Sequence, residues 1–264
     1  MGTGLIPADK GHGHRLGETL IVWRLMADGM TRSRLELART VTAQLRRREG
    51  RNLLAVGLYG SVSRGEDRAH SDIDLVLLVR SGKTGLQMLM RNGVLVSLLR
   101  LTRDEAADEV RGYSWNLPEA LSGWRSVQEL YDPGGLLRSL RDRSLRPRAH
   151  QFREAARGGF LGTFEDYGKL LNALEAEDTA EAREMAIWFT HGAAMILLCL
   201  ERQVASTGRR VFAELPNQRG VGNAIRRLRY ETLPLDETTR LARSVWTSLR
   251  SRARTQRIAL PERG

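Results

Sequence analysis

The order of apolar and polar positions divides the chain into two parts. Residues 30–140 alternate segments of helical periodicity with short apolar runs of strand length, among them residues 53–59 and 75–79. After Pro147 the helical period dominates and few runs have the character of a strand. Alternating helices and strands form a sheet with helices packed on it, whereas helices alone form a bundle. The pattern therefore predicts an α/β (α+β) domain followed by an all-α helical bundle.

The two predicted domains cover residues 30–145 and 146–264, with the stretch 138–148 as the linker between them. Residues 1–29 are predicted to be a flexible N-terminal extension, and Met30 is an alternative start of the protein. Asp236 has the residue type and position of a helix N-cap. The helices expected in the second part cover residues 152–176, 180–203, 221–231 and 236–254.

Candidate chemistry lies between the two apolar runs of the first part. Gly60 and Ser61 directly follow the first run, where a glycine lets the backbone approach a bulky anion and the next amides and hydroxyl bind phosphate oxygens. Asp72 and Asp74 open the second run, and residues i and i+2 of a strand point the same way. Two adjacent carboxylates are hard oxygen ligands that suit Mg²⁺. An Asp-x-Asp pair alone is also typical of a solvated strand end, but the compound pattern favours a site for a nucleoside triphosphate and its metal.

This compound pattern resembles the signature of the nucleotidyltransferase superfamily, which includes polymerase beta and the antibiotic nucleotidyltransferases. The sequence is most similar to the kanamycin (aminoglycoside) nucleotidyltransferase group, over roughly residues 30–250. The resemblance implies a nucleotidyltransferase domain with a mixed sheet, followed by the helical bundle. Its further motifs are the segment Thr31-Arg32-Ser33-Arg34 at the start of a helix, the turn Tyr131-Asp132-Pro133-Gly134-Gly135, the segment 164–172 and the apolar helix from His191.

The resemblance also implies roles for single residues. The family's general base corresponds to Glu165 and its phosphate-contacting lysine to Lys169, while Gly60, Ser61 and Arg64 are expected to bind the nucleotide. Glu165 and Lys169 are four residues apart, so on a helix they share one face. Taken alone, that spacing is equally typical of a surface ion pair worth about 0.3–0.5 kcal/mol. Lysine is rare here, because only Lys10, Lys83 and Lys169 stand among the 42 basic residues.

One part of the family pattern is missing. The third metal-binding carboxylate of the family falls at Leu95 or Ser97, and neither is acidic. The nearest acids are Asp104 and Glu105, but Thr102 with Glu105 three residues on predicts a capping box and hence a structural role. Asp72 and Asp74 are still predicted to hold one Mg²⁺, whereas a second ion would lack a ligand.

Composition adds limits on partners and compartment. One cysteine excludes a disulfide framework, and no run of about 18 apolar residues was found, so a cytoplasmic protein without a membrane span is predicted. The net charge of +11 suggests an anionic partner, but the arginines are spread along the whole chain and lack interleaved aromatics. Nucleic-acid binding is possible but not favoured. The charge also requires that a polycationic acceptor meet a locally acidic pocket.

The sequence thus predicts an enzyme that transfers a nucleoside monophosphate, AMP in our interpretation, from its triphosphate to a hydroxyl of a small molecule. An aminoglycoside-type antibiotic is one such acceptor, and pyrophosphate is released. Glu165 deprotonates the acceptor, Asp72 and Asp74 hold one or two Mg²⁺ ions, and the family implies a homodimer in which Glu165 serves either its own site or that of the partner. The alternatives are a nucleotidyl modifier of RNA or protein, as in toxin–antitoxin systems, and a nucleotide-binding module that has lost its activity.

Overall fold

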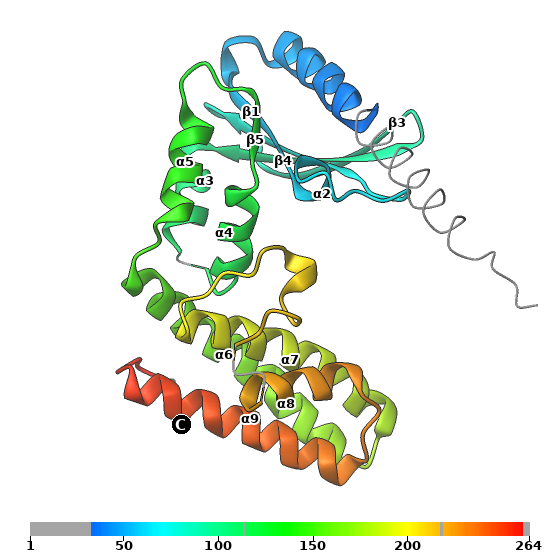
Figure 1. Cartoon of the computed structure of the whole chain (residues 1–264), viewed down its shortest axis with the longest axis vertical. Helices are drawn as coiled ribbons and strands as arrows, with labels where there is room; N and C mark the ends of the chain where they lie inside the picture. Colours follow the sequence, from blue (N-terminus) through cyan, green and yellow to red (C-terminus); the bar gives the residue numbers. More distant parts are fainter. Residues whose placement is uncertain (1–32, 113, 217–218, 261–264) are drawn as a thin grey trace, which may run out of the picture.

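The computed structural model describes residues 33–112, 114–216 and 219–260 (Figure 1). The extension predicted for residues 1–29 and the alternative start at Met30 lie outside the described residues. A sheet with its helices forms one half of the molecule, and four helices form the other half (Figure 1). This is the predicted order of an α/β domain and a helical region.

The sheet has five strands in the order β3-β4-β2-β1-β5. Strands β2 and β4 run parallel, and every other neighbouring pair runs antiparallel, so the sheet is mixed as predicted. A hairpin strand, β3, at the edge of the sheet carries the chain from β2 to β4. The strands are β1 (Leu53–Tyr59), β2 (Ile73–Val79), β3 (Gly85–Arg91), β4 (Val94–Thr102) and β5 (Gln128–Tyr131).

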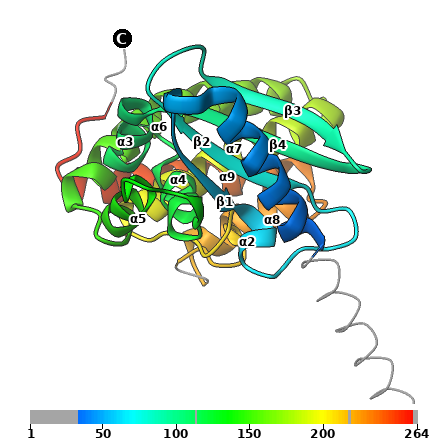
Figure 2. The same ribbon diagram turned by 90° about the horizontal axis from the view of Figure 1, so that it is seen from above.

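The two faces of the sheet are covered by different helices. Strand β2 is apolar throughout after Asp74, so its alternate residues supply both faces. Ile73, Leu75 and Leu77 pack with the helix of residues 33–49, which lies across one face (Figure 2). Val76 and Leu78 pack on the opposite face with helices α3 (Arg103–Arg111), α4 (Leu117–Arg125) and α5 (Leu136–Leu145). Asp74 shares this second face by the same alternation.

Local sequence explains where these helices begin. Thr102 and Glu105 form the predicted capping box at the start of α3. In the family-like turn 131–135, the Asp132 carboxylate accepts the N–H groups of Leu136, Leu137 and Arg138, so this motif caps α5. The predicted linker 138–148 is wrong over most of its length, because α5 continues to Leu145 on a buried apolar stripe.

The helical half contains the four helices expected from the periodicity, although their ends differ by a few residues. Asp236 is not the N-cap of the last helix, because Pro234 occupies that position. Asp236 lies in the first turn, where its negative charge interacts favourably with the helix dipole. The helices are α6 (Ala149–Glu175), α7 (Thr179–Leu200), α8 (Val221–Tyr230) and α9 (Leu235–Thr255).

Three short elements complete the described structure. The 3₁₀ turns are η1 (Gly50–Asn52) and η2 (Gly208–Arg210), and α2 (Gly60–Ser63) is a single helical turn.

Helix α7 forms the centre of the bundle. It is long and apolar enough to cross a membrane by length and composition, with a mean hydropathy of 1.2, which the sequence interpretation did not identify. However, 67% of the 18-residue window is buried inside the structure, so packing accounts for its apolarity. One continuous apolar core runs from Val76 of the sheet through Phe160 and Met195 to Leu249 of the last helix. The sheet and the bundle are therefore packed against each other.

Candidate active site

Asp74 is placed by the pairing of three strands. It lies opposite Tyr59 of β1 and opposite Ser97 of β4, near the start of β2. Asp72 precedes the strand and lies on the same face by alternation. Both carboxylates are half-buried. The predicted pair thus sits at one end of the sheet, on the face that also carries α3 and α4.

Position 60 requires glycine for two reasons, its backbone conformation and the closeness of Asp74. It has φ +76°, in the left-handed region that favours glycine. A Cβ at this position would lie 2.0 Å from Oδ2 of Asp74. The glycine at the end of β1 therefore leaves the space that the Asp74 carboxylate occupies, which links the two predicted motifs physically.

Ser61 follows in the single turn α2 and is 6% exposed. Its hydroxyl has no hydrogen-bond partner within the described residues. A buried polar group without a partner costs about 1–3 kcal/mol, so such groups are usually bonded to something. Ser61 directly follows Gly60, which lies against Asp74. Its unsatisfied hydroxyl could donate a hydrogen bond to a phosphate oxygen.

The loop between α2 and β2 is held by a buried ion pair. Arg34, on the first helix, donates to Asp67 at 2.8 Å, and both side chains are nearly inaccessible. The same guanidinium donates to the carbonyls of Ser71 and Ala69 at 3.1 and 2.8 Å. The Ser71 hydroxyl in turn accepts the amide of Arg68 at 2.8 Å. These bonds fix the path of the chain just before Asp72, and sequence reasoning did not assign Arg34 this role.

Burial is the main reason why the pKa of Asp74 rises to about 6, and the negative charge of Asp72 adds to it. Two cations, Arg209 and Arg64, act in the opposite direction. The pKa of Tyr59 also rises, mainly through burial and then through the charges of Asp74 and other acids. Bringing a cation to the two carboxylates would relieve their repulsion, which is the electrostatic condition for a divalent ion.

Arg209 reaches this site from the other half of the molecule and was not found from the sequence. It lies in the stretch 201–216 after α7, which passes between the bundle and the α/β half (Figure 1). The Ser122 hydroxyl of α4 donates to the Ser206 carbonyl at 3.1 Å, and Glu214 accepts the amide and hydroxyl of Ser206 at 2.7 and 2.6 Å. In a chain with so many arginines, nothing in the local sequence distinguishes Arg209.

Strand register distinguishes the two positions predicted for the missing third carboxylate. Ser97 pairs with Asp74, and its hydroxyl donates to Oδ2 of Asp72 at 3.4 Å. Leu95 shares the face of Ser97 by alternation but pairs nowhere with β2. Across residues 33–112, 114–216 and 219–260, no three His, Cys, Asp or Glu side chains are grouped so that they could hold a metal. Asp72 and Asp74 fit one Mg²⁺ by donor type and charge, and this chain adds a serine hydroxyl in place of a third acid.

Glu165 and Lys169 lie on α6 in the helical half. They form an ion pair of 2.7 Å, with their side chains 68% and 53% exposed. A hydrogen bond from Lys169 lowers the pKa of Glu165, and the lysine's positive charge adds to this effect. The neighbouring charge is Asp166, whose pKa is raised mainly by burial. In the part of the chain that the structure describes, no contact joins this pair to Asp72 or Asp74.

A cavity of about 350 Å³ is lined in part by Tyr59, which lies opposite Asp74 in the pairing of β1 and β2. Val76 and Leu99 of the sheet form its floor, and residues of α3 and α4 form its walls. Two acids, Glu109 and Glu119, face it. Trp124 Nε1 donates to Glu109 at 2.9 Å, yet burial raises the pKa of Glu109. Glu109 was not found from the sequence, because the capping box is the only motif visible in its helix.

The mixed sheet, the turn after β1 and the paired carboxylates at the start of β2 define a nucleotidyltransferase domain. Residues 39–117 match the family model of the nucleotidyltransferase domain. The fold is similar to that of a nucleotidyltransferase-like protein from Exiguobacterium sibiricum 255-15, with a TM-score of 0.54 over 83% of this chain and 75% of that chain, at 10% identity. No curated protein matches the sequence. The protein therefore has a nucleotidyltransferase domain followed by helices, and its fold indicates nucleotidyl transfer in general.

Proposed function

We propose that this cytoplasmic protein transfers AMP from ATP to a hydroxyl of an amine-bearing small molecule and releases pyrophosphate. The observation that carries the proposal is the Ser61 hydroxyl, which is buried and unsatisfied beside the Asp72 and Asp74 carboxylates. A site with a donor for phosphate oxygens and two ligands for a cation supports the binding of a nucleoside triphosphate.

The residues divide the work as follows. Ser61 and the amides of α2 hold the leaving phosphates, and Arg64 and Arg209 offset the negative charge near Asp74. Mg²⁺ held by Asp72 and Asp74 would neutralise the triphosphate and orient it. The acceptor oxygen forms a bond to the α-phosphorus as the bond to the bridging oxygen breaks. Pyrophosphate takes the electron pair of that bond, and the hydroxyl proton passes to a carboxylate.

The acidic cavity supports the acceptor class. Glu109 and Glu119 face it in a protein whose net charge is +11, so the local charge is opposite to the overall one. A triphosphate would be repelled there, whereas a protonated amine would be attracted. The cavity thus has the local acidity that an aminoglycoside-type acceptor needs, and we assign the kanamycin-like subgroup on this basis.

Two carboxylates compete for the role of general base. The family resemblance favours Glu165, which is exposed and would act on the site of a second subunit. Large apolar side chains of the bundle, Leu161 and Phe164 on α6 and Trp188 on α7, are 62%, 51% and 58% exposed, which supports a homodimer through the bundle. Glu109 is the alternative within one chain, because it faces the cavity and its pKa is raised.

A nucleotide-binding module without turnover is the second candidate, and Ser97 favours it. A hydroxyl at the position of the third acid leaves a second ion with two carboxylates only. The two candidates differ in pyrophosphate release and agree in nucleotide binding.

The deciding experiment incubates the protein with labelled ATP and other nucleoside triphosphates, Mg²⁺, and a panel of aminoglycosides, lincosamides and RNA. We expect pyrophosphate and an adenylylated aminoglycoside. Transfer only to RNA or to a protein would identify the nucleotidyl-modifier class instead. ATP binding without pyrophosphate from any acceptor would identify the inactive module.

The base is assigned by mixing variants. If Glu165 acts in trans, Asp72→Asn and Glu165→Gln proteins are each inactive, and their heterodimers regain activity through one intact site. If Glu109 is the base, Glu109→Gln loses roughly 10²–10⁴-fold in rate and Glu165→Gln does not. A monomeric protein with full activity after Glu165→Gln would overturn the trans assignment.

A further inference from the structure

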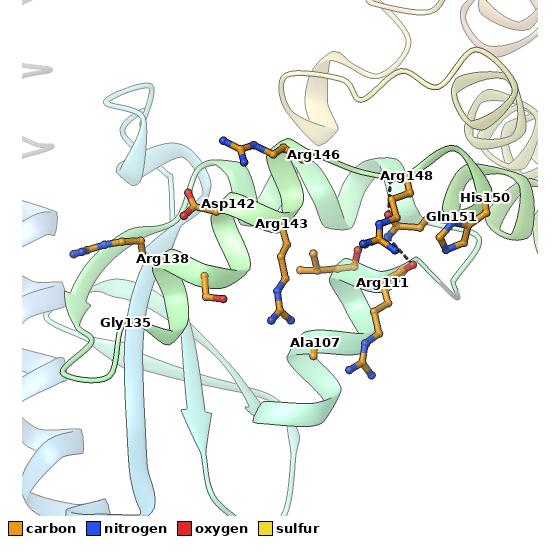
Figure 3. Close-up of a pocket in the computed structure, with 12 residues that line it drawn as sticks. Ala107, Arg111, Gly135, Arg138, Asp142, Arg143, Arg146, Arg148, His150 and Gln151 are labelled. Carbon is orange, nitrogen blue, oxygen red and sulfur yellow. Dashed lines mark hydrogen bonds between the residues drawn. The ribbon is translucent and has the colours of Figure 1, made fainter.

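A second charged region lies away from the carboxylates. Figure 3 shows a cavity of about 750 Å³ between α3, α5 and the start of α6. Arg111 and Arg143 extend from α3 and α5 on either side of Ala107 (Figure 3). Arg138, Arg146 and Arg148 line the same cavity, and Asp142 is its only acid. Five guanidinium groups thus meet one carboxylate.

Ion pairs account for only part of this charge. Arg111 is paired with Asp108 at 2.8 Å and Arg138 with Glu129 at 3.2 Å, both at exposed positions where such pairs are weak. Among the described residues, Arg143, Arg146 and Arg148 have no carboxylate oxygen within 4.0 Å. Their charge is free to meet a mobile anion.

The cavity wall is a fixed part of the fold. Gln151, at the start of α6, donates to the carbonyls of Val110 and Arg111 at 2.8 and 2.7 Å (Figure 3). Arg125 donates to the Ser144 carbonyl at 3.0 Å and holds the end of α5. Arg111, Arg138 and Arg143 therefore project from braced helices, and Arg146 and Arg148 lie in the short turn between α5 and α6.

The charged region continues as a strip over two adjoining cavities. The next one, of about 540 Å³, shares Arg111 and Arg143 with the first and adds Arg80 and Arg103. The third, of about 990 Å³, shares Arg80 and Arg103 and adds Arg51. Asp104 is the one further acid in these two cavities. The strip is thus long, almost uniformly basic, and continuous through shared residues.

The strip lies at the opposite end of the sheet from the carboxylates. Leu54 and Arg80, at the start of β1 and just after β2, line it, whereas Tyr59 and Asp74 mark the other ends of these strands. Tyr59 follows Leu54 by five steps along the strand, a distance of roughly 17 Å. A ligand in the strip would therefore occupy a separate site.

We propose that this arginine strip binds the phosphodiester backbone of a nucleic acid without reading its sequence. A row of guanidinium groups over several cavities matches the repeated charge of a polymer, where a single small anion would use one cavity. The aromatic side chain along the strip is Tyr131, and Arg46 covers its ring at 4.4 Å from the centroid. Without a free stacking platform, the contacts are to phosphates.

The test uses the full chain and fluorescently labelled oligonucleotides of mixed sequence: duplex DNA, duplex RNA and single-stranded RNA. Between about 50 and about 200 mM KCl, roughly five phosphate contacts predict an affinity loss on the order of 10²–10³-fold on a duplex. The three probes show which form fits the strip best. Saturating ATP with Mg²⁺ should leave the affinity unchanged, because the nucleotide site is at the other end of the sheet.

Two double variants that each remove two positive charges distinguish binding by the strip from binding that depends on the net charge of the protein. R143Q/R146Q should bind at least about tenfold more weakly, and its salt slope should fall by about 2. The control R243Q/R254Q changes two exposed arginines of α9 and should keep both values. Unchanged thermal melting would show that each variant is folded.

Equal losses in both double variants would overturn the proposal, because the binding would then follow net charge. Displacement of the oligonucleotide by stoichiometric tripolyphosphate would identify a small-anion site instead. Tighter binding to phosphatidylserine vesicles than to any oligonucleotide at the same salt would identify a membrane surface. None of these outcomes depends on catalysis, so they are distinct from a failure of the proposed function.

Discussion

The two ends of the sheet carry opposite charge in different ways. At one end, Asp72 and Asp74 are half-buried and their positions follow from strand register and from the space left by Gly60. At the other end, Arg143 on α5 and Arg146 just after it are exposed side chains. The first end depends on the placement of a few atoms, and the second depends on the sum of many charges. Single substitutions should therefore have large effects at the carboxylate end and small effects at the arginine end.

The largest effect is expected for Asp74→Asn. Loss of a group that merely supports a metal ligand costs about 10–100-fold in affinity or activity, so loss of the ligand itself should cost more than about 100-fold in Mg²⁺-dependent ATP affinity. Without Mg²⁺, the melting temperature should stay the same or rise, because the substitution removes one of two half-buried like charges. Calorimetric titration of ATP measures the affinity, and Asp142→Asn in the arginine strip is the control. An unchanged affinity would remove the metal site from this end of the sheet.

Gly60→Ala tests whether the carboxylate end depends on backbone geometry. The new Cβ would meet the Asp74 carboxylate at 2.0 Å, and the residue would keep an unfavourable positive φ. We expect a stability loss of about 1–2 kcal/mol from the backbone and a rate loss on the order of 10²-fold from the displaced carboxylate. Gly65→Ala is the matched control, because it also has positive φ but no atom within 4 Å of its Cβ. Similar rate losses in both variants would show that strain alone matters.

Ser97→Asp tests the missing ligand. The new carboxylate would lie beside Asp72 and Asp74, so the variant should melt earlier than wild type in a chelator and regain stability in Mg²⁺. A third charge should tighten Mg²⁺ binding on the order of tenfold. If the protein manages with two acids, turnover at saturating Mg²⁺ will not improve. Leu95→Asp controls for the added charge, because it lies on the same face outside the pairing with β2.

The last prediction concerns the stability of the ion pair between Glu49 and Arg100, near the basic end of the sheet. Arg100 donates two hydrogen bonds to Glu49, at 2.8 and 2.9 Å, and these lower the pKa of Glu49 from 4.5 to about 2. The stabilisation is complete above the unfolded-state pKa and is lost as the pH falls from 4.5 toward 2. Glu49→Gln should cost about 2 kcal/mol near neutral pH and little once the pH has fallen to about 2, measured by denaturant unfolding. A cost that does not change with pH would assign the effect to packing.

The sequence predicted the parts of the molecule that depend on local pattern. Strand runs, helix periods and the capping box at Thr102 use neighbouring residues, and all three were confirmed. The position of the missing third carboxylate was left open between Leu95 and Ser97, and the strand register places Ser97 opposite Asp74. The prediction of a linker over residues 138–148 was wrong. The many arginines of this stretch suggested an exposed connection, although Leu140 is buried in α5.

The remaining site residues required the tertiary structure. Arg209 approaches Asp74 only because the connection after α7 docks on α4. Glu109 faces a cavity whose other walls come from β1, β2 and β4. The arginine strip combines residues from five separate segments, and in a chain with dispersed arginines no local window shows it. Long-range packing, which periodicity does not encode, placed these groups.

The ion pair between Arg34 and Asp67 has a consequence for the order of folding. It joins a helix to a loop 33 residues later, so it cannot form until the helix docks on a sheet whose strands are already paired. The loop before Asp72 would then take its final path in a late step. Nucleotide binding should consequently appear after most of the native circular dichroism has been recovered, and stopped-flow refolding with a fluorescent ATP analogue would time the two events separately.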